Sequence, residues 1–113
     1  MFEELSPEAA MQKFSANQIV MIDVRNPVEF ALERIKGALN APLNTLDPAK
    51  LPVQDGKPIV LICGSGVRSG KAAKMCLEAG LGNIMHVIGG MNAWKMAKLE
   101  TAAINPMTGN MTV

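Results

Sequence analysis

Three short runs of apolar residues stand out along the chain, at Ile19–Ile22, Ile59–Ile62 and, apart from its histidine, Ile84–Ile88. Each run is rich in isoleucine and valine and does not alternate with polar residues. This pattern predicts strands buried on both faces, as in a parallel sheet. The apolar stretch from Gly37 to Leu43 is interrupted by Pro42, and it predicts a short strand at a sheet edge.

Helical segments are predicted between these strands. Ser6-Pro7-Glu8 combines an N-cap, a proline at the first helical position and an acidic residue in the first turn. Asn26–Glu29 repeats the signal as a capping box. Helices are expected to about Phe14 and Leu32, for one turn from Asp47 to Leu51, from about Lys71 to near Gly80, and over residues 91–99. Such alternation predicts an α/β fold with a mainly parallel sheet covered on both faces.

Length and charge narrow the class of protein. At 113 residues, the chain is expected to form one domain over residues 1–104, followed by an aperiodic and mobile tail over residues 105–113. A net charge of +1 gives no basic footprint for nucleic acid or an anionic membrane. Two cysteines are too few for a disulfide scaffold, and no signal peptide is evident, so we expect a free thiol and a cytoplasmic location. We also expect a monomer or weak dimer.

Candidate chemistry gathers where the second apolar run ends. Cys63 follows the run directly, and a loop containing two glycines leads from it into a helix. Such a loop points backbone N–H groups and the positive end of a helix dipole at one spot, which would stabilise a thiolate. Parallel strands would also place Asp23, which ends the first run, at the same sheet edge.

The residues around this loop have two possible uses. Arg68 is either a fixed positive charge beside the thiolate or a structural partner of Asp23 or Glu29. Ser69 is expected to be the N-cap of the next helix, and Ser65 to donate to the sulfur. Asp23 and Arg25 are expected to brace the loop. His86 lies within a strand, where a packed role is favoured over catalysis, and Cys76 is expected to be a core residue. The scattered methionines and the cysteine spacing indicate no metal site.

In these features the chain resembles the rhodanese-like single-domain sulfurtransferases. Four motifs carry the resemblance: Asp23-Val24-Arg25, Glu33–Leu43, Cys63–Ser69 and Gly89–Trp94. In order and spacing, the resemblance covers roughly residues 5–99. The resemblance implies a three-layer α/β sandwich with a five-stranded, mostly parallel sheet. It also implies that Cys63 accepts a sulfane sulfur from thiosulfate or from a small-molecule or protein persulfide. The cysteine would hold this sulfur as a persulfide and pass it to a thiol or cyanide, without a cofactor. The substrate-binding loop would be Gly64, Ser65, Gly66, Val67, Arg68 and Ser69.

Two departures from the family pattern bear on function. Gly64 stands where many relatives have a basic residue, which makes a persulfide donor more plausible than thiosulfate. Glu33–Lys36 replaces a Gly-His-Ile-Pro segment, so we expect an altered loop conformation there.

The alternatives are a non-catalytic binding or regulatory module, a redox or selenium-handling thiol protein, and a cysteine phosphatase of related fold. Such phosphatases place one more residue between cysteine and arginine than the four found between Cys63 and Arg68.

Overall fold

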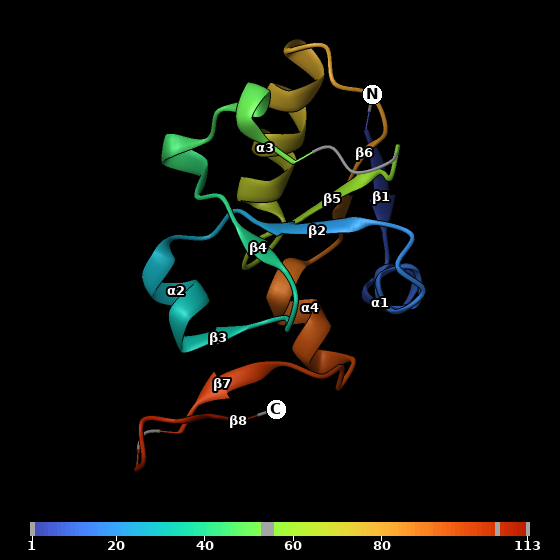
Figure 1. The fold of residues 1–113 in the computed structure, drawn as a ribbon. Coiled ribbons are helices and arrows are strands. Elements are labelled where there is room, and N and C mark those ends of the chain that lie inside the picture. Colours follow the sequence, from blue (N-terminus) through green and yellow to red (C-terminus); the bar gives the residue numbers. More distant parts are fainter. Residues whose placement is uncertain (1, 53–55, 106, 113) are drawn as a thin grey trace.

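The predicted buried strands form the middle of a parallel sheet. The structure is a computed structural model that describes residues 2–52, 56–105 and 107–112. Its central strands are β2 (Val20–Asp23), β5 (Ile59–Ile62) and β6 (Ile84–Val87), flanked by β1 (Glu3–Leu5) and β4 (Leu39–Asn40). The order is β1-β6-β5-β2-β4, and every pairing is parallel (Figure 1). The predicted five-stranded α/β sandwich is confirmed.

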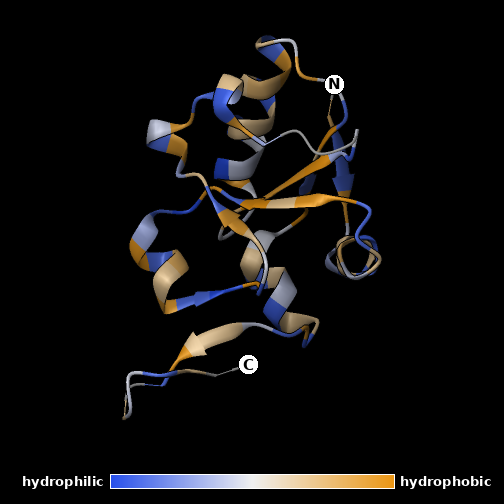
Figure 2. Cartoon of the chain, viewed as in Figure 1, coloured by the Kyte–Doolittle hydropathy of each residue, from blue (hydrophilic) through white to orange (hydrophobic). Residues whose placement is uncertain are grey.

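Helices cover the two faces of this sheet and complete the three layers. On one face, Leu61 and Cys63 pack with Ala72, Ala73 and Cys76 of α3 (Val67–Glu78). The opposite face packs against α1 (Pro7–Ser15) and α4 (Gly90–Met96), chiefly through Ala10, Met91 and Trp94. Figure 2 shows the central strands as the hydrophobic layer between these helices.

The helix starts predicted at Ser6 and Asn26 are confirmed in atomic detail. The Ser6 side chain accepts a hydrogen bond from the N–H of Ala9 at 3.1 Å. Asn26 and Glu29 form the reciprocal capping box that begins α2 (Pro27–Leu32). The turn expected after Asp47 is the short 3-10 helix Pro48–Lys50, and a second one spans Leu43–Thr45.

Four strands have no counterpart in the apolar pattern. β1 is largely polar and exposed, and it gains its conformation by pairing with β6. The other three form a separate antiparallel sheet of β3 (Glu33–Arg34), β7 (Ala102–Ile104) and β8 (Met111–Thr112). β3 lies within the segment that departs from the family pattern.

The segment after residue 104 turns back along β7. The N–H of Asn105 donates to the Asn110 carbonyl at 2.7 Å, and β8 then pairs with β7. Residues 106 and 113 lie outside the described residues, and the domain boundary at residue 104 stays a prediction. Over the described residues, no helix combines the length and apolarity needed to cross a membrane.

Candidate functional site

Cys63 lies at the carboxyl end of β5, where the chain leaves the sheet. Gly66, with φ of +103°, turns the backbone through the left-handed region and becomes the N-cap of α3. β2 pairs with β5 so that Asp23 is the register partner of Ile62. The structure therefore brings Asp23 to the same sheet edge as Cys63, as the sequence predicts.

The loop surrounds the Cys63 sulfur with hydrogen-bond donors. The N–H of Gly66 donates to Sγ at 3.0 Å. Burial raises the pKa of the Cys63 thiol. Hydrogen bonds from the Ser69 hydroxyl and from the backbone N–H groups of Ser69, Gly66 and Ser65 lower this pKa, and together they outweigh the effect of burial. The net effect is a thiol pKa below its ordinary value. These donors form a cradle around the sulfur, to which Ser65 contributes its backbone N–H. The sequence predicts that the Ser65 side chain donates to the sulfur, but Ser65 is an exposed residue.

Ser69 is not the N-cap of α3, contrary to the expectation from the sequence. The helix already begins at Val67, because Gly66 adopts the capping position without any side chain. The Ser69 hydroxyl is instead buried inside the site. Its oxygen lies 3.5 Å from Cys63 Sγ, 3.3 Å from the Gly66 carbonyl oxygen and 2.8 Å from His86 Nδ1, and its single proton can be donated to one of these groups at a time.

Arg68 pairs with Glu29 and not with Asp23. Its Nη1 and Nη2 atoms donate to the two carboxylate oxygens of Glu29 at 2.6 and 3.1 Å. This pairing lowers the pKa of Glu29 and raises that of Arg68, and the negative charge of the nearby Cys63 thiolate also favours the charged guanidinium. The structure thus shows the pairing with Glu29, whereas a direct role of the Arg68 charge at the thiolate stays a prediction. A Cβ atom at Gly64 would lie 3.0 Å from Arg68 Nη2, so with a side chain there the guanidinium would have to shift slightly.

Asp23 and Arg25 form a separate buried ion pair. Arg25 Nη2 lies 2.8 Å from Asp23 Oδ2, and the Arg25 backbone N–H donates to Asp23 Oδ1 at 2.9 Å. Arg25 Nη2 also donates to the Glu33 carbonyl at 2.6 Å. The pair fixes the chain that leaves β2 and ties it to β3.

The Gly89-Gly90 motif brings the start of α4 into hydrogen-bonding contact with the backbone of the cysteine loop. At the start of α4, the N–H of Met91 donates to the Cys63 carbonyl at 2.6 Å, and the N–H of Asn92 donates to the Gly64 carbonyl at 3.0 Å. Gly90 has φ of +57°, and a Cβ atom on it would lie 2.8 Å from the Gly64 carbonyl carbon. Only a glycine lets the two backbones approach this closely.

Cys63 itself is 0% exposed, although a nucleophilic thiol must come into contact with its substrate. On its side of the sheet, Val24, Asn26, Leu43, Asn44 and Arg68 line a cavity of about 240 Å³. Val24 and Leu43 pack in the same cluster as Cys63, so this cavity lies over the layer that holds the sulfur.

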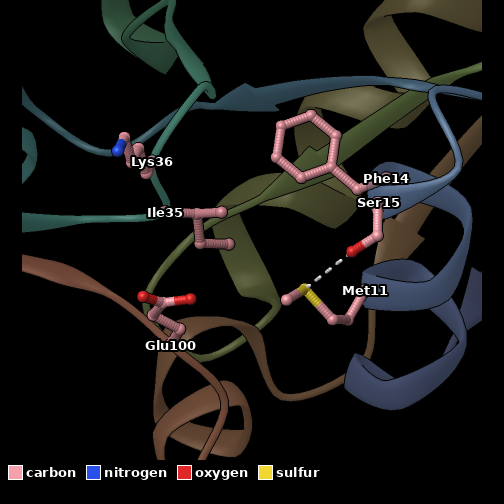
Figure 3. A pocket seen from close by; sticks show the side chains of 6 residues that line it. All are labelled: Met11, Phe14, Ser15, Ile35, Lys36 and Glu100. Atoms are coloured by element: carbon pink, nitrogen blue, oxygen red, sulfur yellow. Dashed lines mark hydrogen bonds between the residues drawn. The ribbon is translucent and has the colours of Figure 1, made fainter. Parts of the chain in front are cut away.

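A second cavity of about 240 Å³ lies in the opposite layer and shares no residue with the loop. Figure 3 shows Phe14 and Ile35 facing one another across it, while Lys36 extends away. On α1, the Ser15 hydroxyl donates to Met11 Sδ at 3.7 Å, and Glu100 completes the lining.

The second cysteine is a core residue, as predicted. Cys76 is fully buried on α3, and this burial raises the pKa of its thiol. Both cysteines are free. Within the described part of the chain, no three His, Cys, Asp or Glu side chains gather as metal ligands.

The sequence predicts only a packed role for His86, and it predicts no role for Glu4. His86 is buried within β6, and its Nε2 lies 3.0 Å from Glu4 Oε2. Its Nδ1 reaches the Ser69 hydroxyl that contacts Cys63. One signal was available: a histidine within a strand that is predicted to be buried on both faces needs polar partners.

Comparison with known proteins identifies the class. Residues 6–97 match the rhodanese-like domain, so the chain belongs to the rhodanese-like family. It is 30% identical over 103 residues to the thiosulfate sulfurtransferase GlpE of Actinobacillus succinogenes, covering 89% of this chain and 93% of that protein. The crystal structure of a rhodanese-related protein from Thermoplasma volcanium matches with a TM-score of 0.78 and 26% identity, covering 88% of this chain and 97% of that one.

A more similar relative carries no assigned activity. An uncharacterized protein of Synechocystis is 40% identical over 97 residues, which are 86% of this chain. The chain spans only 54% of that relative's length. Family membership is thus established, whereas the reaction has to be argued from the site.

Proposed function

We propose that the protein is a rhodanese-type sulfurtransferase that carries sulfur on Cys63. The Cys63 thiolate attacks the sulfane sulfur of a donor, either a persulfide or thiosulfate. The donor's S–S bond breaks, and a thiolate or sulfite leaves with the bonding electron pair. A thiol or cyanide acceptor then attacks the outer sulfur of the Cys63 persulfide, which forms a new persulfide or thiocyanate and restores the Cys63 thiolate.

The observation that carries this proposal is the donor cradle around Sγ. A thiolate nucleophile must be ionised near neutral pH and must also be a good leaving group when the acceptor attacks. The N–H groups of Ser65, Gly66 and Ser69 and the Ser69 hydroxyl favour the anionic sulfur. Because the same anion is regenerated in the second step, these donors would assist both transfers.

The surroundings of Gly64 favour a persulfide over thiosulfate as the donor. Thiosulfate is a dianion, so its capture depends on positive charge beside the loop. Glycine at position 64 supplies none, and the positive charge of Arg68 is largely offset by the bidentate pair with Glu29. A small-molecule or protein persulfide carries less charge and depends less on this attraction. A reducing cytoplasm would supply suitable thiol acceptors.

A turnover assay tests this function. The protein is given thiosulfate or a low-molecular-weight persulfide, with cyanide as the acceptor, and thiocyanate is measured. Turnover is expected with the persulfide, at least tenfold weaker with thiosulfate, and lost in Cys63→Ser. The matched control is Cys76→Ser, which removes a thiol from α3 but should keep turnover. A folded wild-type protein that forms no thiocyanate with either donor would refute the proposal.

The phosphatase alternative is tested with an aryl phosphate. Only four residues separate Cys63 from Arg68, so the loop is one residue shorter than that of the phosphatases of related fold. No turnover of the aryl phosphate is expected. Clear hydrolysis that disappears in Cys63→Ser would favour the phosphatase.

A further inference from the structure

A chain of hydrogen bonds leads from Cys63 to the protein surface, on the side of the loop away from Arg68 and Glu29. Cys63 Sγ lies 3.5 Å from Ser69 Oγ, and Ser69 Oγ lies 2.8 Å from His86 Nδ1. The other ring nitrogen, His86 Nε2, lies 3.0 Å from Glu4 Oε2. The first three residues are buried, whereas the Glu4 side chain is 59% exposed. This chain of hydrogen bonds thus connects the buried thiol of Cys63 to a carboxylate that is exposed to solvent.

The parallel register places these groups on one face of the sheet. His86 is the register partner of both Glu4 on β1 and Leu61 on β5. Cys63 follows Leu61 by two residues, and side chains two apart on an extended chain point to the same side. Helix α3 covers this face, and Ser69 in its first turn fills the space between the sulfur and the imidazole.

The surroundings of the imidazole leave few groups that can exchange a proton with it. From β1, the Phe2 ring contacts it edge-on at 5.0 Å between centroids, and Glu4 binds Nε2. From α3, Ser69 binds Nδ1, and from β5, Leu61 is its apolar register neighbour. Among these neighbours of the ring, Glu4 is the one with a charged side chain.

The donors and acceptors in this chain can be arranged in two ways. An ionised Glu4 only accepts hydrogen bonds, so Nε2 carries a proton. A neutral His86 therefore presents a bare Nδ1, the Ser69 hydroxyl donates to it, and the Cys63 S–H donates to Ser69. Alternatively, a protonated Nδ1 donates to Ser69, whose hydroxyl then donates to a Cys63 thiolate. The two arrangements differ only by the shift of two protons along the chain.

We propose that Cys63 loses its proton along this chain, so that the reactive thiolate is paired through Ser69 with a His86 imidazolium that Glu4 stabilises. The S–H bond breaks as the Ser69 oxygen takes that proton, and the original hydroxyl proton moves to Nδ1. No oxidation is involved. His86 and Glu4 are positioning residues, because they act through Ser69. The ionisation of Cys63 does not depend on the proposed function, but the role of the resulting thiolate in sulfur transfer does.

The test is the pH midpoint of Cys63 alkylation by iodoacetamide, which reports the ionisation of the thiol without any sulfur donor. Glu4→Gln keeps an acceptor near Nε2 but removes the charge that favours the imidazolium. The midpoint is expected to rise, with alkylation at pH 7 slowed roughly two- to fivefold, the range that a partly exposed ion pair supports. Direct charge repulsion between Glu4 and the thiolate would give the opposite sign, because removing Glu4 would then lower the midpoint.

The matched control is Glu3→Gln, which removes the same charge from the neighbouring position of β1, where the side chain points to the other face of the sheet. It should leave the midpoint unchanged. An unchanged or lower midpoint in Glu4→Gln, or an equal rise in Glu3→Gln, would overturn the proposal.

Removal of the middle link provides a second test. Ser69→Ala should raise the midpoint, and adding Glu4→Gln to it should give no further rise, because the connection is already broken. A further rise of the same size in the double variant would refute action through Ser69. If these shifts occur but Cys63 takes up no sulfur, the proposed function is refuted, whereas proton transfer along the hydrogen-bond chain (the relay) is supported. If turnover occurs without the shifts, only the relay fails.

Discussion

Replacing Gly90 with alanine would place a methyl group in the contact between α4 and the cysteine loop. A Cβ atom at Gly90 would lie 2.8 Å from the Gly64 carbonyl carbon and 2.9 Å from that of Cys63. Both are backbone atoms, so no flexible side chain can move aside. The α4 start would have to shift, together with the Met91 and Asn92 N–H groups that bind this loop.

Two costs add in this variant. A non-glycine residue in the left-handed region costs about 1 kcal/mol, and forcing a methyl group into a filled contact costs about 2 kcal/mol more. We therefore expect Gly90→Ala to lower the free energy of unfolding by about 3 kcal/mol. The loop should also be displaced from its geometry, so the N–H of Gly66 would bind the thiolate less well and the alkylation midpoint of Cys63 should rise.

Denaturant unfolding measures the first effect, and Gly80→Ala is the matched control. Gly80 has φ of +90°, but a Cβ atom there would meet nothing within 4 Å. Its substitution should cost only the backbone component, about 1 kcal/mol, and should leave the Cys63 midpoint unchanged. Equal losses of stability in the two variants, with no change in the midpoint of Gly90→Ala, would refute this explanation of the Gly89-Gly90 motif.

Three further substitutions test other parts of the site. Asp23→Asn leaves Arg25 buried without its counterion, and urea unfolding should show a loss of about 3 kcal/mol; a loss below 1 kcal/mol would contradict this role. Arg68 lowers the pKa of Glu29, so their pair stabilises the fold above the ordinary carboxyl pKa and loses this effect as the pH falls through the lowered value. Glu29→Gln should cost only about 0.5 kcal/mol at pH 7, because the pair is partly exposed, and should weaken the fall in stability below about pH 4.5; an unaltered acid profile would argue against the pair. Gly64→Lys adds a positive charge and should raise thiosulfate turnover several-fold more than persulfide turnover; equal changes would remove charge as the reason for donor preference.

The apolar pattern predicts the centre of the fold because burial there is continuous. β2, β5 and β6 lie at the three apolar runs, and the edge position of β4 agrees with Pro42, which follows two residues after the strand ends. Local polar signals were equally informative at Ser6 and Asn26, where the side chain binds a backbone N–H only three residues away. Where the cause of a structure lies within a few residues, the sequence predicts it well.

Contacts between distant segments account for what could not be predicted. β3 pairs with β7 across about 70 residues. β3 is polar and only two residues long, and the apolar β7 has only three residues, so no local pattern signals the pairing. The start of α3 was misplaced because Gly66 caps it through its backbone conformation, which leaves Ser69 free to bind inside the site. The link from Cys63 to His86 depends on the register of two strands and on α3 above them.

The same limit explains the ambiguity at Arg68. Asp23 and Glu29 were both plausible partners, since each has a carboxylate near the predicted sheet edge. The structure settles the pairing because the Arg25 guanidinium already binds both oxygens of Asp23. Glu29, held at the start of α2 by its capping box, is the carboxylate that remains for Arg68.

The most direct test of sulfur transfer is the mass of the protein after incubation with a persulfide donor and, separately, with thiosulfate. Peptide mapping should place one additional sulfur atom on Cys63 after the persulfide treatment. Cyanide should remove this sulfur, Cys63→Ser should not acquire it, and Cys76→Ser should acquire it as the wild type does. A folded protein whose Cys63 gains no sulfur from either donor would contradict the proposed function.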